Sequence, residues 1–210
     1  MIWYASYGSN LLRARFMAYI QGGSPPGESF AQVGCTDPTP PRDDRPMKIP
    51  HRLYFAQRSR NWENGGVCFI QRKPEPGVET LGRMYLVTEE QYKEVFYQEN
   101  GWNGFREERA GAGGPAGGEG KDLLRLDLDR VPPLGAMKTA APGWYSTILH
   151  LGEHRGHPIF TFTASWDESR IPHTPPGPRY RDTVARGIRE RYGLPEPEIQ
   201  AYLERWSPGS

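Results

Sequence analysis

The sequence is poor in cysteine and has no long hydrophobic run. Its 210 residues include two cysteines, Cys35 in a proline-rich stretch and Cys68 in a strand-like run. This arrangement does not suggest a disulfide framework, and it predicts two reduced thiols in a cytoplasmic protein. No stretch approaches about eighteen apolar residues, and the start of the chain lacks a basic region followed by an apolar one. We therefore expect neither a membrane-spanning helix nor a secretory signal peptide.

An excess of charge of one sign is also missing. The chain carries 26 Lys and Arg against 25 Asp and Glu, a formal net charge of +1, and the basic residues are scattered among the acidic ones. A chain of this kind has no global field that favours a polyanion. We therefore expect no nucleic acid and no membrane among its partners.

Proline and glycine are abundant, with 21 and 25 residues, which indicates many turns between regular elements. Alternating or continuous apolar runs predict strands at 2–7, 51–57, 65–73, 82–87, 123–129, 144–151 and 158–164. Helical spacing predicts helices at 11–21, 88–101, 179–192 and 196–206. The segments 22–50 and 106–121 are expected to be loop insertions. This mixture predicts a single α+β domain over residues 1–210, whose sheet can close into a small barrel.

The helix predicted over 88–101 has clear signals at both ends. Thr88 and Gln91 have the spacing of a capping box, in which each side chain binds a backbone N–H group of the other residue. Asn100 and Gly101 predict a left-handed stop.

The same helix carries an acid where an apolar residue is expected. Its apolar stripe consists of Tyr92, Val95 and Phe96. The same spacing continues to Glu99. The other acids of the helix lie off this stripe, namely Glu89, Glu90 and Glu94. Burial and the negative end of the helix dipole would raise the pKa of Glu99 towards the range of a general base. In the alternative, the helix end frays and Glu99 faces water.

The stretch from Tyr7 to Asn10 lies between the first predicted strand and the first predicted helix. A strand, a tight turn and a helix in succession place the backbone N–H groups of Gly8, Ser9 and Asn10 in one concave cluster. Such a cluster holds an anionic or polarised oxygen. The alternative is an ordinary turn capped by Ser9 or Asn10. An oxygen-binding turn together with one buried carboxylate predicts a site for amide chemistry without a metal.

At four places the residues resemble the γ-glutamylcyclotransferase-like family. The stretch "YASYGSNLL" (4–12) resembles the signature turn of the family, and "WENGGVCFI" (62–70) resembles its Gly-Gly strand. The stretch "GRMYLVTEEQYKEVFYQEN" (82–100) resembles the strand and helix that end in the catalytic Glu, which falls on Glu99. Finally, "PPGPRYRDTVARGIRERYGLP" (175–195) is similar to the C-terminal segment, whose Tyr falls on Tyr180. The resemblance spans residues 3 to about 195.

The resemblance implies a small mixed β-barrel with flanking helices and an enzyme that uses neither metal nor cofactor. In its best-known reaction, the α-amine of a γ-glutamyl compound attacks its own γ-amide carbonyl and releases 5-oxoproline and an amine. Glu99 would act as the catalytic acid and base. The substrate would be bound by Tyr7, Gly8, Ser9, Asn10 and Tyr180. The expected partner is a small γ-glutamyl substrate, and a homodimer is left open.

Two departures from the family pattern leave the substrate open. Asn100 stands where a Gly usually follows the catalytic Glu, and Asn64 stands where a His can precede the paired glycines. A catalytically idle member of the fold that binds a small molecule is therefore an alternative.

A zinc amidohydrolase or deacetylase is a third and less favoured hypothesis. It is suggested by four residues within eight positions, namely His150, Glu153, His154 and His157. A helical zinc motif needs two His on one helix face. This segment instead lies between two strand-like runs and contains two glycines, so we expect a hairpin turn over 152–156.

Overall fold

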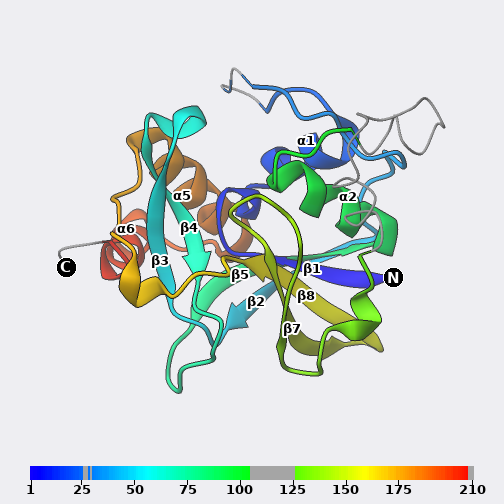
Figure 1. The fold of residues 1–210 in the computed structure, drawn as a ribbon. Coiled ribbons are helices and arrows are strands. Elements are labelled where there is room, and N and C mark those ends of the chain that lie inside the picture. The colour runs from blue at the N-terminus through cyan, green and yellow to red at the C-terminus, as the bar shows by residue number, and fades with distance from the viewer. Residues whose placement is uncertain (26–27, 29, 105–125, 208–210) are drawn as a thin grey trace. The chain divides into compact units, whose positions relative to one another are not determined.

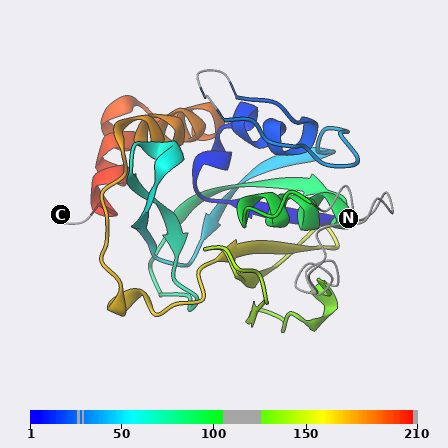
Figure 2. The same cartoon turned by 45° about the horizontal axis from the view of Figure 1, so that its top comes forward.

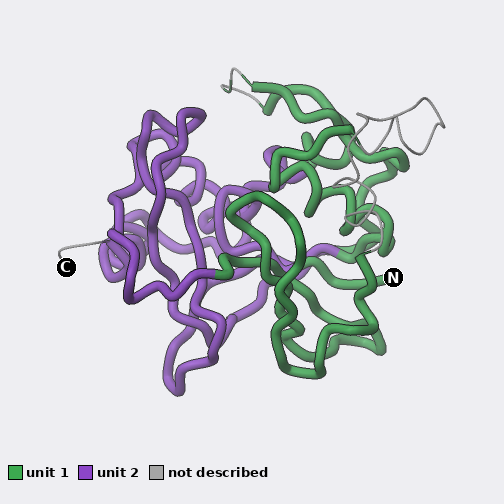
Figure 3. Tube along the Cα trace, viewed as in Figure 1, with its two compact units in different colours: residues 1–4, 17–43, 86–165 green, residues 5–16, 44–85, 166–210 purple. Residues whose placement is uncertain are grey.

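A computed structural model describes residues 1–25, 28, 30–104 and 126–207 of the chain (Figure 1). The chain divides into two compact units, which are coloured separately in Figure 3. Unit 1 comprises residues 1–4, 17–43 and 86–165, and unit 2 comprises residues 5–16, 44–85 and 166–210. The single domain over 1–210 stays a prediction.

The described strands are β1 (Ile2–Ser6), β2 (Asp43–Ile49), β3 (Leu53–Ser59), β4 (Gly65–Ile70), β5 (Thr80–Val87), β6 (Ala136–Lys138), β7 (Thr147–His154) and β8 (His157–Thr163). The described α-helices are α1 (Arg13–Gln21), α2 (Glu89–Glu99), α5 (Pro178–Tyr192) and α6 (Glu196–Arg205). Short 3₁₀ turns are η1 (Ser9–Leu11), η2 (Arg60–Trp62), η3 (Leu128–Arg130) and η4 (Glu168–Arg170). None of these helices is long and apolar enough to cross a membrane.

The described strands form two sheets. Six strands follow the order β2-β5-β1-β8-β7-β6, with β1 parallel to β8, while β3 and β4 form a separate antiparallel pair. The predicted α+β class is confirmed. Within the described residues, however, the larger sheet is open and does not close into a barrel. Its edge strands are poor partners, because Pro46 in β2 lacks an N–H donor and β6 has only three residues.

Two strands were not expected from the sequence, and one expected strand is wrong. β2 lies in the segment predicted as an irregular loop, because its residues "DDRPMKI" are mostly charged and only Ile49 is buried. β6 is too short to show a period. Of the strand predicted over 123–129, residues 123–125 lie outside the described residues, and η3 occupies 128–130. The predicted loop 106–121 also lies outside the described residues.

In unit 1, β7 and β8 form the predicted hairpin. Their last pair is His154 and His157, and the two residues between them, Arg155 and Gly156, have φ values of 51° and 74°. A two-residue turn with positive φ at both positions matches the twist of the strands that it joins. The hairpin predicted from the glycines and the flanking apolar runs is therefore confirmed.

The helix α2 of unit 1 has both of its predicted end signals. Thr88 Oγ1 accepts from the Gln91 N–H at 3.1 Å, and Gln91 Oε1 accepts from the Thr88 N–H at 3.0 Å. This closes the capping box. At the other end Gly101 has a φ of 75°, which is the left-handed stop that a glycine adopts without a steric cost.

In unit 2, the segment 173–177 crosses the β3–β4 pair and explains the paired glycines. The Gly66 N–H donates to the Pro175 carbonyl at 2.8 Å. A Cβ at Gly66 would lie 2.0 Å from the Thr174 carbonyl oxygen, and one at Gly65 would lie 2.1 Å from the Gly177 nitrogen. Only glycine permits this approach of two backbones. The segment then leads into α5, which lies beside α6 (Figure 2).

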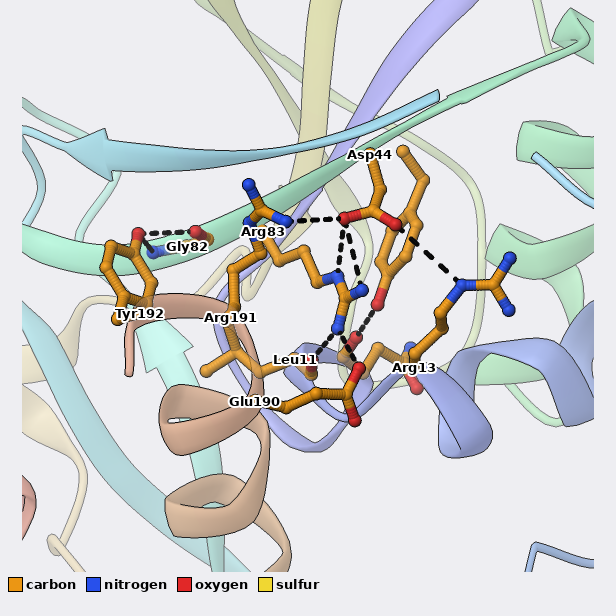
Figure 4. A network of polar contacts seen from close by, with 10 residues as sticks. Leu11, Arg13, Asp44, Gly82, Arg83, Glu190, Arg191 and Tyr192 are labelled. Carbon is orange, nitrogen blue, oxygen red and sulfur yellow. Dashed lines mark hydrogen bonds and ion pairs between the residues drawn. The ribbon is translucent and has the colours of Figure 1, made fainter. Parts of the chain in front are cut away.

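A buried guanidinium organises the centre of unit 2 (Figure 4). The Arg83 side chain is 4% exposed, and its Nη1 donates to the Leu11 carbonyl at 3.1 Å and to Glu190 at 2.6 Å. Its Nε and Nη2 lie 3.2 and 3.1 Å from Oδ1 of Asp44. Burial acts to lower the pKa of Arg83, but the contacts with Tyr85, Asp44 and Glu190 raise it above its ordinary value. The guanidinium therefore stays charged and joins β5 to β2, to α5 and to the turn before α1.

We predict that Arg83→Gln lowers the free energy of unfolding by about 3 kcal/mol, because it takes the side-chain donor from the buried Leu11 carbonyl and removes one cationic partner each from Asp44 and Glu190. The midpoint of urea unfolding measures this. Arg13→Gln is the matched control, because its side chain is 43% exposed and lies 3.8 Å from Asp44. Arg13→Gln should lower the free energy of unfolding by less than about 1 kcal/mol. Equal midpoints for Arg83→Gln and the unmodified protein would contradict the prediction.

Candidate functional site

The turn that begins at Gly8 is held through its carbonyl groups. The Leu11 N–H donates to the Gly8 carbonyl at 2.9 Å, and the Leu12 N–H donates to the Ser9 carbonyl at 3.1 Å. The N-cap position of η1 is Gly8, and no side-chain hydrogen bond is made there. Within the described residues, the N–H groups of Gly8 and Ser9 donate to no acceptor. The turn itself therefore uses neither of these two donors.

Gly8 is required by the close approach of a tyrosine. A Cβ at this position would lie 2.8 Å from the hydroxyl of Tyr180 and 3.2 Å from Cβ of Cys68. The structure thus brings together two of the residues predicted from the sequence, Gly8 and Tyr180.

Tyr180 is locked in place on the first turn of α5. The residue is 2% exposed, and its ring packs edge-on against Trp62 with ring centres 4.9 Å apart. Its oxygen accepts from the Cys68 N–H at 3.0 Å. The hydroxyl also forms a hydrogen bond with the side chain of Cys68.

Further along α5, Gly187 lets the helix approach the same turn. A Cβ at Gly187 would lie 2.5 Å from the Leu12 nitrogen. The helix α5 therefore contacts the turn at two points, through Tyr180 and through Gly187. This accounts for the Tyr and the Gly in the C-terminal motif.

Cys68 is a neighbour of this site and not a nucleophile. Burial raises the pKa of its thiol to about 12. At neutral pH the sulfur stays protonated, and the reactive species of a cysteine is the thiolate.

Glu99 belongs to unit 1, whereas Tyr7, Gly8, Ser9, Asn10 and Tyr180 belong to unit 2. Glu99 is the last residue of α2 and is half-buried. Its role as a base stays a prediction.

One acid of α2 was misplaced by the sequence pattern. Glu94, which lies off the predicted apolar stripe, is 1% exposed. Its carboxylate accepts from the Thr36 N–H at 2.7 Å and from the Thr36 hydroxyl at 2.8 Å. The reason is that the segment 34–39 covers a second face of the helix, where Gln91 donates to the carbonyls of Asp37 and Thr39. The sequence did contain a signal of this buried polar face, namely the helical spacing of Gln91, Glu94 and Gln98.

Asn100 has a structural role that explains its departure from the family pattern. Its Nδ2 donates to the Phe96 carbonyl at 2.9 Å and to the Tyr145 carbonyl at 3.2 Å, and its Oδ1 accepts from the Tyr145 N–H at 3.0 Å. A Cβ at Gly143 would lie 2.6 Å from Cα of Asn100. Asn100 therefore fastens the end of α2 to the segment that precedes β7.

The histidines suggested as zinc ligands lie along the β7–β8 hairpin. His150 Nδ1 accepts from the Leu134 N–H at 2.9 Å, and the His154 ring packs edge-on against Trp3 with ring centres 5.3 Å apart. In the part of the chain that the structure describes, no three His, Cys, Asp or Glu side chains form a group that could hold a metal ion.

No family model matches the chain. A curated relative from Arabidopsis thaliana, named histone deacetylase 5, is 34% identical over 212 residues. The match covers 97% of this chain and 30% of the relative. The chain thus spans less than a third of the length of that protein.

Two solved structures are similar over 100% of this chain and 89% of their own. One is named gamma-glutamyl cyclotransferase, with a TM-score of 0.45 and 17% identity. The chain is similar in fold to this protein. The other, an uncharacterized protein from Homo sapiens, has a TM-score of 0.49 and 16% identity. At these identities a likeness concerns the fold and does not extend to activity.

We predict that Gly8→Ala lowers the free energy of unfolding by about 1–3 kcal/mol, because its Cβ overpacks against the Tyr180 hydroxyl. In a Tyr180→Phe background the same change should cost at least about 1 kcal/mol less, because the clashing oxygen is gone. Urea unfolding of the two single variants and the double variant measures this coupling. Strict additivity of the two changes would show that the hydroxyl does not limit the space at Gly8.

Proposed function

We propose that the protein catalyses a metal-free intramolecular aminolysis of a γ-glutamyl amide or peptide, which releases 5-oxoproline and an amine. The observation that carries the proposal is the turn at Gly8, in which two backbone N–H groups are available beside the buried hydroxyl of Tyr180. The four motifs that resemble the γ-glutamylcyclotransferase-like family support the same reaction. We also propose a cytoplasmic location, because the two cysteines of the chain are expected to be reduced thiols.

The reaction needs little from the protein, because the nucleophile is part of the substrate. Attack through a five-membered ring brings the α-amine to the γ-carbonyl carbon without an enzyme nucleophile. A new C–N bond closes the ring, and the C–N bond to the leaving amine breaks. The α-ammonium group loses two protons and the leaving amine gains two, so no external acid or base is consumed.

Glu99 would move these protons. As a carboxylate it takes a proton from the α-ammonium group, and as a carboxylic acid it returns the proton to the leaving amine. The N–H groups of Gly8 and Ser9 would bind the γ-carbonyl oxygen as it becomes an oxyanion, or the α-carboxylate of the substrate. Tyr180 would donate its hydroxyl proton to the substrate from the side of α5, in place of the hydrogen bond that it makes with the Cys68 side chain.

Two other functions remain as candidates. A catalytically idle member of the fold would bind the same ligands at the same turn without turnover. A deacetylase is suggested by the histidine-rich stretch 150–157 and by the name of the Arabidopsis thaliana relative, of which this chain spans 30%. Release of 5-oxoproline from a panel of γ-glutamyl dipeptides and γ-glutamyl amines separates the proposed reaction from both alternatives.

We predict that Glu99→Gln keeps the fold and lowers kcat by roughly 10²–10⁴-fold, which is the usual contribution of general acid–base catalysis. The assay is the release of 5-oxoproline. Two glutamates on the same helix serve as controls. The exposed residue Glu90, as Glu90→Gln, should change neither stability nor kcat.

The second control is Glu94→Gln. It should lower stability by about 1–3 kcal/mol, because the Thr36 N–H and hydroxyl donate to this carboxylate, and it should leave kcat within about twofold. Near-native turnover by Glu99→Gln would remove Glu99 from the mechanism.

The proposed reaction also predicts insensitivity to chelators. Ring closure by a tethered amine needs no Lewis acid, whereas a zinc hydrolase makes its nucleophile at the metal and loses activity when stripped. Extensive dialysis against a chelator should therefore leave turnover unchanged, and His154→Ala should alter kcat/KM by less than about threefold. Stoichiometric zinc that is required for turnover would overturn the proposal in favour of an amidohydrolase.

A further inference from the structure

Each carbonyl group of residues 8–11 has its own donor. Two donors are local, because the Leu11 and Leu12 N–H groups bind the carbonyls of Gly8 and Ser9. The other two come from β5, where the Tyr85 hydroxyl donates to the Asn10 carbonyl at 2.8 Å and Arg83 donates to the Leu11 carbonyl at 3.1 Å. The orientation of the whole turn is therefore coupled to two side chains of one strand.

The coupling follows from the planarity of the peptide group. In a trans peptide, the carbonyl of one residue and the N–H of the next point in opposite directions. When Tyr85 holds the Asn10 carbonyl, it also fixes the direction of the Leu11 N–H. That N–H donates to the Gly8 carbonyl, which in turn fixes the direction of the Ser9 N–H. The tyrosine thus orients the Ser9 amide through two peptide planes and one hydrogen bond.

A parallel path starts at Arg83. Its guanidinium holds the Leu11 carbonyl and so fixes the Leu12 N–H, which donates to the Ser9 carbonyl and thereby orients the peptide between Ser9 and Asn10. The two paths end at neighbouring amides. Hydrogen bonds linked in this way also polarise one another.

Both donors on β5 are themselves immobile. The Tyr85 ring is fully buried and stacks on Phe16, with ring centres 4.0 Å apart and planes at 18°. The Arg83 guanidinium lies over the Tyr85 ring at 5.2 Å and is paired with Asp44 and Glu190. Neither side chain can leave the turn without breaking these contacts.

We propose that Tyr85 is a positioning residue that aims the Ser9 N–H at an oxygen of the substrate. This inference rests on the proposed function, which supplies the γ-glutamyl substrate. A donor fixed before the reaction needs no reorganisation when negative charge develops, so its orientation contributes to the rate or to substrate affinity. Tyr85 itself touches no substrate in this scheme.

The first test uses the free protein and needs no substrate. Tyr85→Phe removes one oxygen atom and keeps the ring that stacks on Phe16. In ¹H–¹⁵N spectra it should shift the amide signals of Leu11 and Ser9 more than those of Gly8 and Asn10. Tyr192→Phe is the matched control, because its hydroxyl binds backbone groups of Met47 and Gly82 and none in the turn. It should leave the Ser9 signal in place.

The second test measures kcat and KM for 5-oxoproline release. Tyr85→Phe should lower kcat/KM by about tenfold or more, through kcat if the Ser9 amide binds the oxyanion and through KM if it binds the α-carboxylate. Tyr192→Phe should change neither constant, although it also removes a half-buried hydroxyl. An equal loss in both variants would reduce Tyr85 to a structural role and overturn the inference.

The two tests separate two failures. Unchanged Leu11 and Ser9 signals in Tyr85→Phe would overturn the inference and leave the proposed reaction standing. The expected signal shifts in a protein that turns over no γ-glutamyl compound would reject the proposed function alone. Shifted signals with unchanged kcat and KM would show that the Ser9 amide is oriented by Tyr85 but is not used, which also overturns the inference.

Discussion

Unit 2 depends on one charged group in a place where charge is costly. The guanidinium of Arg83 is almost completely buried, and a charge in such a place is tolerated only when it is paired and fully hydrogen-bonded. Asp44 and Glu190 supply the opposite charge from two other elements, and the Leu11 carbonyl takes a further N–H donor. Since each partner comes from a different part of the chain, satisfying Arg83 requires β2, β5, α5 and the turn to assemble together.

The second constraint on unit 2 is the close approach of backbones, and glycine meets it at every point. Gly65 and Gly66 admit the segment 173–177, Gly187 admits the turn before α1, and Gly8 admits the Tyr180 hydroxyl. None of these contacts is a strong interaction. Together they set how near α5 lies to the turn, and hence where the Tyr180 oxygen lies relative to Gly8. The glycines therefore determine the geometry of the site as much as the side chains of its other residues do.

Local signals allowed most elements of the fold to be predicted, and contacts between distant segments were the part that could not be. The capping box of Thr88 and Gln91 and the glycine stop after α2 all lie between Thr88 and Gly101, so α2 was correctly placed. The strand β2 was not predicted, because an edge strand with a proline and mostly charged residues has no apolar face. Glu94 was misplaced because the segment that buries it lies 58 residues away.

The candidate site divides in the same way. The resemblance of motifs located the turn, Glu99 and Tyr180, but the contact between Tyr180 and Gly8 spans most of the chain and leaves no local trace. Arg83 and Tyr85 were overlooked, although an arginine in an apolar strand, two residues from a tyrosine on the same face, was a signal of a buried polar contact.

The distribution of the two thiols has a practical consequence for studying motion. Cys35 and Cys68 are both buried and neither forms a disulfide, and one belongs to each compact unit. A buried thiol reacts with an alkylating reagent only after the structure around it opens. The rate of alkylation at each cysteine, read separately by mass spectrometry, therefore reports how often each unit opens. Each unit thus contains one natural cysteine whose alkylation rate can be measured without introducing a label.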